Sequence, residues 1–383
     1  MTRAEKKVIR RFQRVEKGVI NELASYIGKA GKVKDPADWI IGRLYERGHT
    51  IDGIQAAIRK ASSISKKDLS DIFEAAAKDA SLCNSKLYKL SGKTPIPYQD
   101  NAGLQQVVRA IITQTAGTVD NFTKTTGFII KDKAGNKKVL PLHQVFTDYL
   151  DDAALEVIYG YKDPYTAIED CVNTLTASGL RTVDYASGRT DRIDTAVRRA
   201  IITGTNQITA HVQETDAALL GTDKFEVSFH SGARPSHQVW QGRVYSKTEL
   251  TTICGLGTPG GLCGASCRHT YYPFIEGISK RSYTDKYIRD ETARENTPVI
   301  YPPTGRTYTK YEATQYLRAL ELRMRVQDER VEALKAAGAT QQAITAAESK
   351  YAIISSTYTH FAWTMELPEE RERLLKNRRK KTP

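Results

Sequence analysis

The side chains of this sequence that could do chemistry gather between Phe225 and Gly277. Three of the seven histidines, three of the five cysteines and one of the three tryptophans fall in this stretch. Imidazole and thiolate groups bind zinc, and near neutral pH they also transfer protons or act as nucleophiles. A metal site or an active site is therefore to be expected here.

The cysteine and histidine spacing is compatible with a compact tetrahedral zinc site. Three residues separate Cys263 from Cys267, and His269 follows two positions later. A more distant histidine, His237 or His230, would complete the set. The candidate zinc ligands are His237, Cys263, Cys267 and His269. The alternative is that the cysteines are small buried residues and the histidines hydrogen-bond to the backbone.

Two catalytic interpretations compete with a metal site. Cys267 is followed by an arginine and a histidine, which could lower its pKa and make it a nucleophile. His230 and His237 could together catalyse acid–base cleavage of RNA. The glycine-rich run 255–264 lacks the Gly-Lys-Ser/Thr ending of a phosphate-binding loop, and no set of acids completes either site. We expect no enzymatic activity, and keep a metal-dependent nuclease or a toxin-like RNase as the alternative.

Helical periodicity dominates the chain before this stretch. Apolar residues recur every three or four positions in residues 8–27, 104–116, 143–159, 164–179 and 190–214. Between Asp35 and Ala76, capping signals and Gly48 predict a series of short helices joined by tight turns. The lysine-rich segment 131–138 is expected to form an exposed hairpin tip.

The period changes from helical to strand-like at Phe225. Phe225, Val227 and Phe229 alternate with polar residues, as in a strand with one buried face. Segments 243–246 and 271–275 are further strand candidates. The sequence therefore predicts a small α+β module within a predominantly helical protein.

The C-terminal part predicts a helical hairpin followed by a basic tail. Apolar residues from Ala313 to Leu334 follow a heptad pattern, Gly338 interrupts it, and a second helical pattern includes Ile344 and Ile354. The tail is a candidate DNA contact through Arg371, Arg373, Lys376, Arg378, Arg379, Lys380 and Lys381.

Charge and composition restrict the class of protein. The formal net charge is +13, which favours an anionic partner such as nucleic acid. Hydrophobic residues make up 40% and charged residues 26%, as in ordinary globular proteins. We expect no membrane partner, because no apolar run approaches the roughly 20 residues that span a bilayer. The charged start, residues 1–14, predicts no secretion signal.

Three short motifs carry a resemblance to a known family. In order, they are the run from His230 to His237, then Trp240-Gln241-Gly242, then Cys267-Arg268-His269. This order resembles phage minor capsid protein 2, a family of tailed-phage head proteins related to the Mu F-like head morphogenesis proteins. The matched residues, taken as a fold-determining motif, are His230, Arg234, Pro235, His237, Trp240, Gly242, Cys267, Arg268 and His269. Segments 196–203, 311–315 and 320–323 extend the likeness.

The resemblance implies a structural role in head assembly. Members assemble inside the capsid near the portal vertex, so the implied partners are the portal protein, the major capsid or scaffolding protein, and packaged double-stranded DNA. The implied location is the virion, after assembly in the host cytoplasm, and related proteins have been linked to DNA ejection. One alternative is a metal-dependent nuclease or toxin-like RNase delivered with phage DNA, and another is a nucleic-acid-binding protein outside the virion.

Four consecutive regions are expected along the chain. They are a helical portal-docking region (1–100), a helical body (101–179), a Mu F-like α+β module with the His/Cys cluster (180–280), and a helical hairpin with the basic tail (281–383).

Overall fold

The computed structural model describes residues 2–30, 32, 36–131, 135–183, 190–264 and 267–374. Its contacts divide the chain into two compact units, described separately below. Unit 1 comprises Met1–Ile64, Val119–Val197 and Leu317–Pro383, and unit 2 comprises Ser65–Thr118 and Arg198–Tyr316. Each unit combines segments from several of the four consecutive regions expected from the sequence. The units therefore do not test those regions, which stay a prediction.

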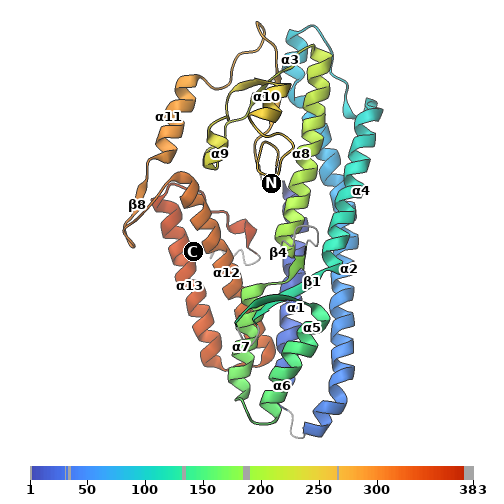
Figure 1. Ribbon diagram of the computed structural model, residues 1–383, viewed down its shortest axis with the longest axis vertical. Coiled ribbons are helices and arrows are strands. Elements are labelled where there is room, and N and C mark those ends of the chain that lie inside the picture. The colour runs from blue at the N-terminus through green and yellow to red at the C-terminus, as the bar shows by residue number, and fades with distance from the viewer. Residues whose placement is uncertain are drawn as a thin grey trace, which may run out of the picture. The chain divides into compact units, whose positions relative to one another are not determined.

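The protein is predominantly helical with small antiparallel sheets, as the sequence predicted (Figure 1). The helices are α1 (Arg3–Ala30), α2 (Pro36–Cys83), α3 (Ser85–Leu90), α4 (Ala102–Lys124), α5 (Leu142–Val145), α6 (Asp151–Ile158), α7 (Pro164–Ser178), α8 (Ile193–Leu220), α9 (Pro235–Gln238), α10 (Lys247–Thr252), α11 (Asp285–Asn296), α12 (Lys310–Ala337) and α13 (Gln341–Thr364). Short 3-10 turns are η1 (Tyr98–Asp100) and η3 (Arg371–Arg373), and η2 (Phe146–Leu150) is a π-helical turn. The strands are β1 (Thr126–Lys131), β2 (Lys137–Pro141), β3 (Arg181–Val183), β4 (Thr190–Arg192), β5 (Lys224–Val227), β6 (Val244–Ser246), β7 (Tyr271–Phe274), β8 (Val299–Tyr301) and β9 (Arg306–Tyr308).

Helix α1 of unit 1 buries the apolar stripe that its sequence predicts. Phe12 and Leu23 are fully buried, and Val19 and Ile27 are nearly so. The stripe arises because residues three and four apart lie on one helix face.

The prediction of short helices between Asp35 and Ala76 is wrong, because α2 is continuous over this stretch. Gly48 lies within the helix instead of ending it. A helical glycine costs only about 1 kcal/mol relative to alanine, and the apolar face continues beyond it through Ile54 and Ile58, which are both buried. Packing of that face therefore outweighs the local stop signal.

The sheet of unit 1 has the antiparallel order β2-β1-β3-β4. The hairpin predicted at 131–138 is confirmed by its flanks, where Lys131 pairs with Lys137. Residues 132–134 at its tip lie outside the described residues. The three-residue strands β3 and β4 were not predicted, because such short segments carry no readable alternation.

The predicted C-terminal hairpin is confirmed, with α12 and α13 side by side (Figure 1). Gly338 adopts φ +70° after α12, a left-handed conformation that glycine accepts without strain. Thr340 then caps α13 by accepting a hydrogen bond from the Ala343 N–H. This short turn reverses the chain, and the Tyr358 hydroxyl of α13 donates to Glu321 of α12 at 3.1 Å.

Unit 2 contains the predicted α+β module. Its three strands form an antiparallel sheet of order β6-β5-β7. Ser246 and Glu249 form a reciprocal capping box at the start of α10. Phe225, Val227 and Tyr271 belong to the apolar cluster that supports the sheet.

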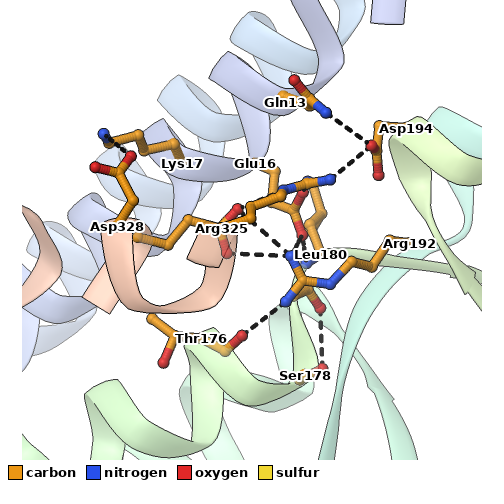
Figure 2. A network of polar contacts seen from close by, with 12 residues as sticks. Gln13, Glu16, Lys17, Thr176, Ser178, Leu180, Arg192, Asp194, Arg325 and Asp328 are labelled. Carbon is orange, nitrogen blue, oxygen red and sulfur yellow. Dashed lines mark hydrogen bonds and ion pairs between the residues drawn. The ribbon is translucent and has the colours of Figure 1, made fainter. Parts of the chain in front are cut away.

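A group of buried charges connects distant segments of unit 1 (Figure 2). The Glu16 carboxylate of α1 is 0% exposed, pairs with Arg192 at 3.1 Å and also pairs with Arg325 of α12. It accepts a further hydrogen bond from the Leu180 N–H at 2.9 Å. Gly179 leaves room for this carboxylate, since a Cβ there would lie 2.3 Å from Glu16 Oε1.

Two guanidinium groups in this network share three carboxylates. Glu329 pairs with Arg192 at 3.1 Å and with Arg325 at 2.8 Å. Asp194 pairs with Arg325 at 2.6 Å and accepts a hydrogen bond from Gln13 at 3.2 Å. Burial raises the pKa of Asp194 above its usual range.

Among the described residues, none of the helices combines the length and apolar character needed to span a membrane.

Replacing Gly28 by alanine is predicted to destabilise unit 1. A Cβ at Gly28 would lie 2.2 Å from the Ala337 backbone oxygen, so α1 and α12 must separate, at a cost of about 1–3 kcal/mol. Gly18→Ala is the matched control, because nothing lies within 4 Å of its Cβ and helix propensity alone should stabilise by up to about 1 kcal/mol. Chemical unfolding would measure both, and an equal gain in both variants would contradict the close approach.

Removing Arg192 is predicted to destabilise the protein strongly. Arg192→Met leaves the Glu16 carboxylate buried without one of its cations, which typically costs about 3–5 kcal/mol. The control Lys286→Met breaks a 2.5 Å pair with Asp290 whose side chains are 80% and 53% exposed, so about 1 kcal/mol or less is expected. Comparable unfolding midpoints for the two variants would show that the buried network contributes little.

Candidate metal centre

A single turn of helix positions His237. Arg234 precedes α9 in an extended conformation, and Pro235 occupies the first helical position, where its fixed φ suits the helix. The His237 N–H donates to the Arg234 carbonyl at 2.8 Å. The turn directs the His237 side chain inward, and the residue is 2% exposed.

Cys267 and His269 lie in the segment that leads into β7. In an extended segment, residues two apart point to the same side. Their side chains do meet, with 3.5 Å between Cys267 Sγ and His269 Nδ1. Asn206 of α8 fixes the preceding loop by donating to the carbonyl oxygens of Cys263 at 3.3 Å and Cys267 at 3.4 Å.

The side chains of His237, Cys267 and His269 converge on one another. The two Nδ1 atoms are 3.3 Å apart, and His237 Nδ1 lies 3.8 Å from Cys267 Sγ. All three residues are buried, and their candidate ligand atoms lie within 4.8 Å of one another. The structure therefore brings together three of the four side chains predicted to bind zinc.

The other nitrogen of each imidazole contacts an oxygen atom. His237 Nε2 lies 2.9 Å from the Gly260 carbonyl oxygen, and His269 Nε2 lies 2.9 Å from Gln241 Oε1. Such second contacts fix the ring orientation of histidines in metal sites.

Trp240 forms one wall of the centre. Its ring centroid lies 4.5 Å from that of His237 and 4.8 Å from that of His269. Trp240 is 3% exposed and belongs to the apolar cluster of the module. It thus connects the histidines to the core and excludes water from that side.

Burial favours the uncharged forms of these groups. It lowers the pKa of His237, and it lowers that of His269 to about 3. Burial also raises the pKa of the Cys267 thiol, although backbone hydrogen bonds oppose this change. The cause is the loss of hydration that each charged form would suffer.

The fourth predicted ligand, Cys263, is not part of this three-residue cluster. Its Sγ lies 3.5 Å from the backbone oxygen of His269. Burial raises its pKa to about 12, so the reactive thiolate is strongly disfavoured. Whether Cys263 binds metal stays a prediction.

The remaining motif residues occupy several different positions. The His230 ring packs edge-on against His269 with a centroid distance of 4.9 Å, and its Nε2 lies 3.0 Å from Ser228 Oγ. Gly242 adopts φ +72°, and a Cβ there would lie 3.1 Å from Ile288. Arg268 is exposed, so its side chain is not part of the buried cluster.

Sequence reasoning missed two residues that hold the centre together. Gln241 is 0% exposed, and its Oε1 contacts both the His230 N–H and His269 Nε2. Asn206 lies far away in sequence, on α8. Neither amide residue has a spacing that predicts its role, although Gln241 belongs to a motif noted above.

The arrangement suits a cation better than a bound substrate. Imidazole and thiolate are preferred zinc ligands. The two histidines are 2% and 3% exposed, whereas groups that act on a substrate must reach it. These three side chains are therefore the residues that could hold a metal ion.

The chain is similar to known phage proteins. The chain is 24% identical over 265 residues to a protein of Lactococcus phage LL-H described as a structural protein, covering 65% of this chain and 68% of that relative. No solved structure matches the chain. The family model for phage minor capsid protein 2 matches residues 1–361. The chain therefore belongs to the phage minor capsid protein 2 family.

Proposed function

We propose that this protein is a minor component of the phage head, bound to the portal protein inside the capsid and in contact with packaged DNA. The observation that carries the proposal is the family match over residues 1–361. The phage relative described as a structural protein supports the same role. Assembly with the major capsid or scaffolding protein in the host cytoplasm would precede its final location in the virion.

Charge supports the proposed contact with DNA. The net charge of +13 suits a neighbour that carries one negative charge per roughly 1.7 Å of helix axis. The strongest basic run is the tail, of which Lys376, Arg378, Arg379, Lys380 and Lys381 lie outside the described residues. These five remain the candidate contacts.

The two described basic residues of the tail region have intramolecular partners. Arg371 pairs with Glu369 and donates to Ser355 Oγ at 3.1 Å. Arg373 pairs with Glu321 at 3.4 Å and with Glu370. We assign these two arginines to attachment of the chain end to α12 and α13, which separates them from the DNA contacts proposed further along.

We propose that the protein acts by assembly and catalyses no reaction. An RNase or nuclease centred on His237 and His269 would need a phosphodiester to reach rings that are almost fully buried. The Trp240 wall and the contacts with Gln241 and Gly260 instead fix both rings in place.

Purified virions should contain this protein in far fewer copies than the major capsid protein. Quantitative mass spectrometry before and after DNA release would measure this ratio and show whether the protein leaves with the genome. Cryo-electron microscopy without imposed symmetry should place its density at the portal vertex. Absence from purified particles would instead favour the nucleic-acid-binding protein outside the virion.

Neutralising the tail is predicted to weaken DNA binding and its salt dependence. A variant with Gln at positions 376, 378, 379, 380 and 381 should lower the slope of log K against log salt by up to about 4.5, at about 0.9 per lost phosphate contact. The matched control replaces Arg371 and Arg373 by Gln, and should lower stability while leaving the slope unchanged. A slope that falls only in the control would contradict the proposal, because it would show that Arg371 and Arg373 contact DNA and the five tail residues do not.

A further inference from the structure

The buried cluster in unit 2 has the dimensions of a tetrahedral zinc site. With Zn–N bonds of about 2.0–2.1 Å and a Zn–S bond of about 2.3 Å, tetrahedral angles require about 3.3–3.4 Å between nitrogens and about 3.5–3.6 Å from nitrogen to sulfur. The observed separations are 3.3 Å between the histidine Nδ1 atoms, and 3.5 and 3.8 Å from these atoms to Cys267 Sγ. Little adjustment would be needed to place an ion among them.

The hydrogen bonds around the cluster determine which ring nitrogens carry protons. Gln241 Oε1 lies 3.0 Å from the His230 backbone N–H, which can only donate. This contact identifies the amide atom as oxygen, so His269 Nε2 must donate to it. His237 Nε2 must likewise donate to the Gly260 carbonyl. In a neutral imidazole the other nitrogen then has no proton, so both Nδ1 atoms present lone pairs.

Without a cation these two lone pairs face each other at 3.3 Å. The proton available within the cluster is that of the Cys267 thiol, which can point to one nitrogen at a time. The second nitrogen would be a buried acceptor without a donor from the cluster, which destabilises the folded state. A cation among the three atoms removes this conflict and retains both outer hydrogen bonds.

We propose that His237 Nδ1, Cys267 Sγ and His269 Nδ1 bind one zinc ion that stabilises the α+β module. Zinc suits a set of two imidazoles and one thiolate. Binding displaces the thiol proton to solvent, because the thiolate is the ligand. Gln241 and the Gly260 carbonyl orient the two rings from behind. The Cys263 thiol lies outside this ligand set, because it contacts the His269 carbonyl.

Zinc analysis of the purified full-length chain provides the first test. Inductively coupled plasma mass spectrometry should find about one zinc per chain. Chelation should lower the midpoint of thermal unfolding, followed by a spectroscopic signal from the α+β module, and added Zn²⁺ should restore it. Metal-free protein whose midpoint is unchanged by chelator and by Zn²⁺ would overturn the proposal, as would one equivalent of a different metal.

Cobalt replacement tests the ligand set without any mutation. Titrating Co²⁺ into chelator-treated wild-type protein should produce the absorption of tetrahedral cobalt together with a thiolate-to-cobalt charge-transfer band, saturating at about one equivalent. A spectrum of octahedral cobalt, or one without the thiolate band, would contradict the proposed ligands.

Variants separate ligands from neighbouring groups. Cys267→Ser and His269→Ala should lose the zinc, and the midpoint of any folded variant should no longer respond to chelator. His230→Ala is the matched control, because it removes an imidazole that packs on His269 but lies outside the ligand set. It should keep one zinc, as should Cys263→Ser. Loss of zinc from Cys263→Ser would overturn the three-ligand assignment, and loss from His230→Ala would overturn the choice of histidines.

Discussion

The buried Glu16 carboxylate is the constraint on which the core of unit 1 depends. A carboxylate with no exposed surface must be paired, and here Arg192, Arg325 and the Leu180 N–H supply its partners. These partners come from segments far apart in the sequence. Any alternative packing of α1 against them would leave a charge in an apolar setting, at several kcal/mol. The network therefore favours one register of these helices over others in a way that apolar contacts alone do not.

The His/Cys centre applies the same principle in unit 2. There the polar groups are imidazoles and a thiol, and the amide of Gln241 orients the His269 ring while the Gly260 carbonyl orients the His237 ring. Both sites place polar atoms where water cannot compensate for a missing partner, so each requires its complete set of neighbours. In a phage minor capsid protein, such sites favour one rigid arrangement of the chain.

Much of the fold could be predicted from local sequence patterns, but the partners of buried polar groups could not. The period-two alternation at Phe225 predicted a strand, and the heptad pattern of α12 predicted a helix. Both predictions succeeded because burial of one face makes apolar residues recur at a fixed period. Gly48 led to a wrong prediction, because the free-energy cost of a glycine within a helix is smaller than the stabilisation that packing gives to α2. The histidine and cysteine types identified the centre, whereas Gln241 and Asn206 have no distinguishing spacing.

The interleaved composition of unit 1 has a consequence for synthesis on the ribosome. Arg325 is added roughly 300 residues after Glu16, which takes about 15–60 s at typical bacterial elongation rates of about 5–20 residues per second. For most of that interval α1 lies outside the ribosome while the cation from α12 has not been made. Completion of this core must therefore wait until Arg325 leaves the exit tunnel, and until then the emerged part of the chain must remain soluble, by its own hydration or with a chaperone.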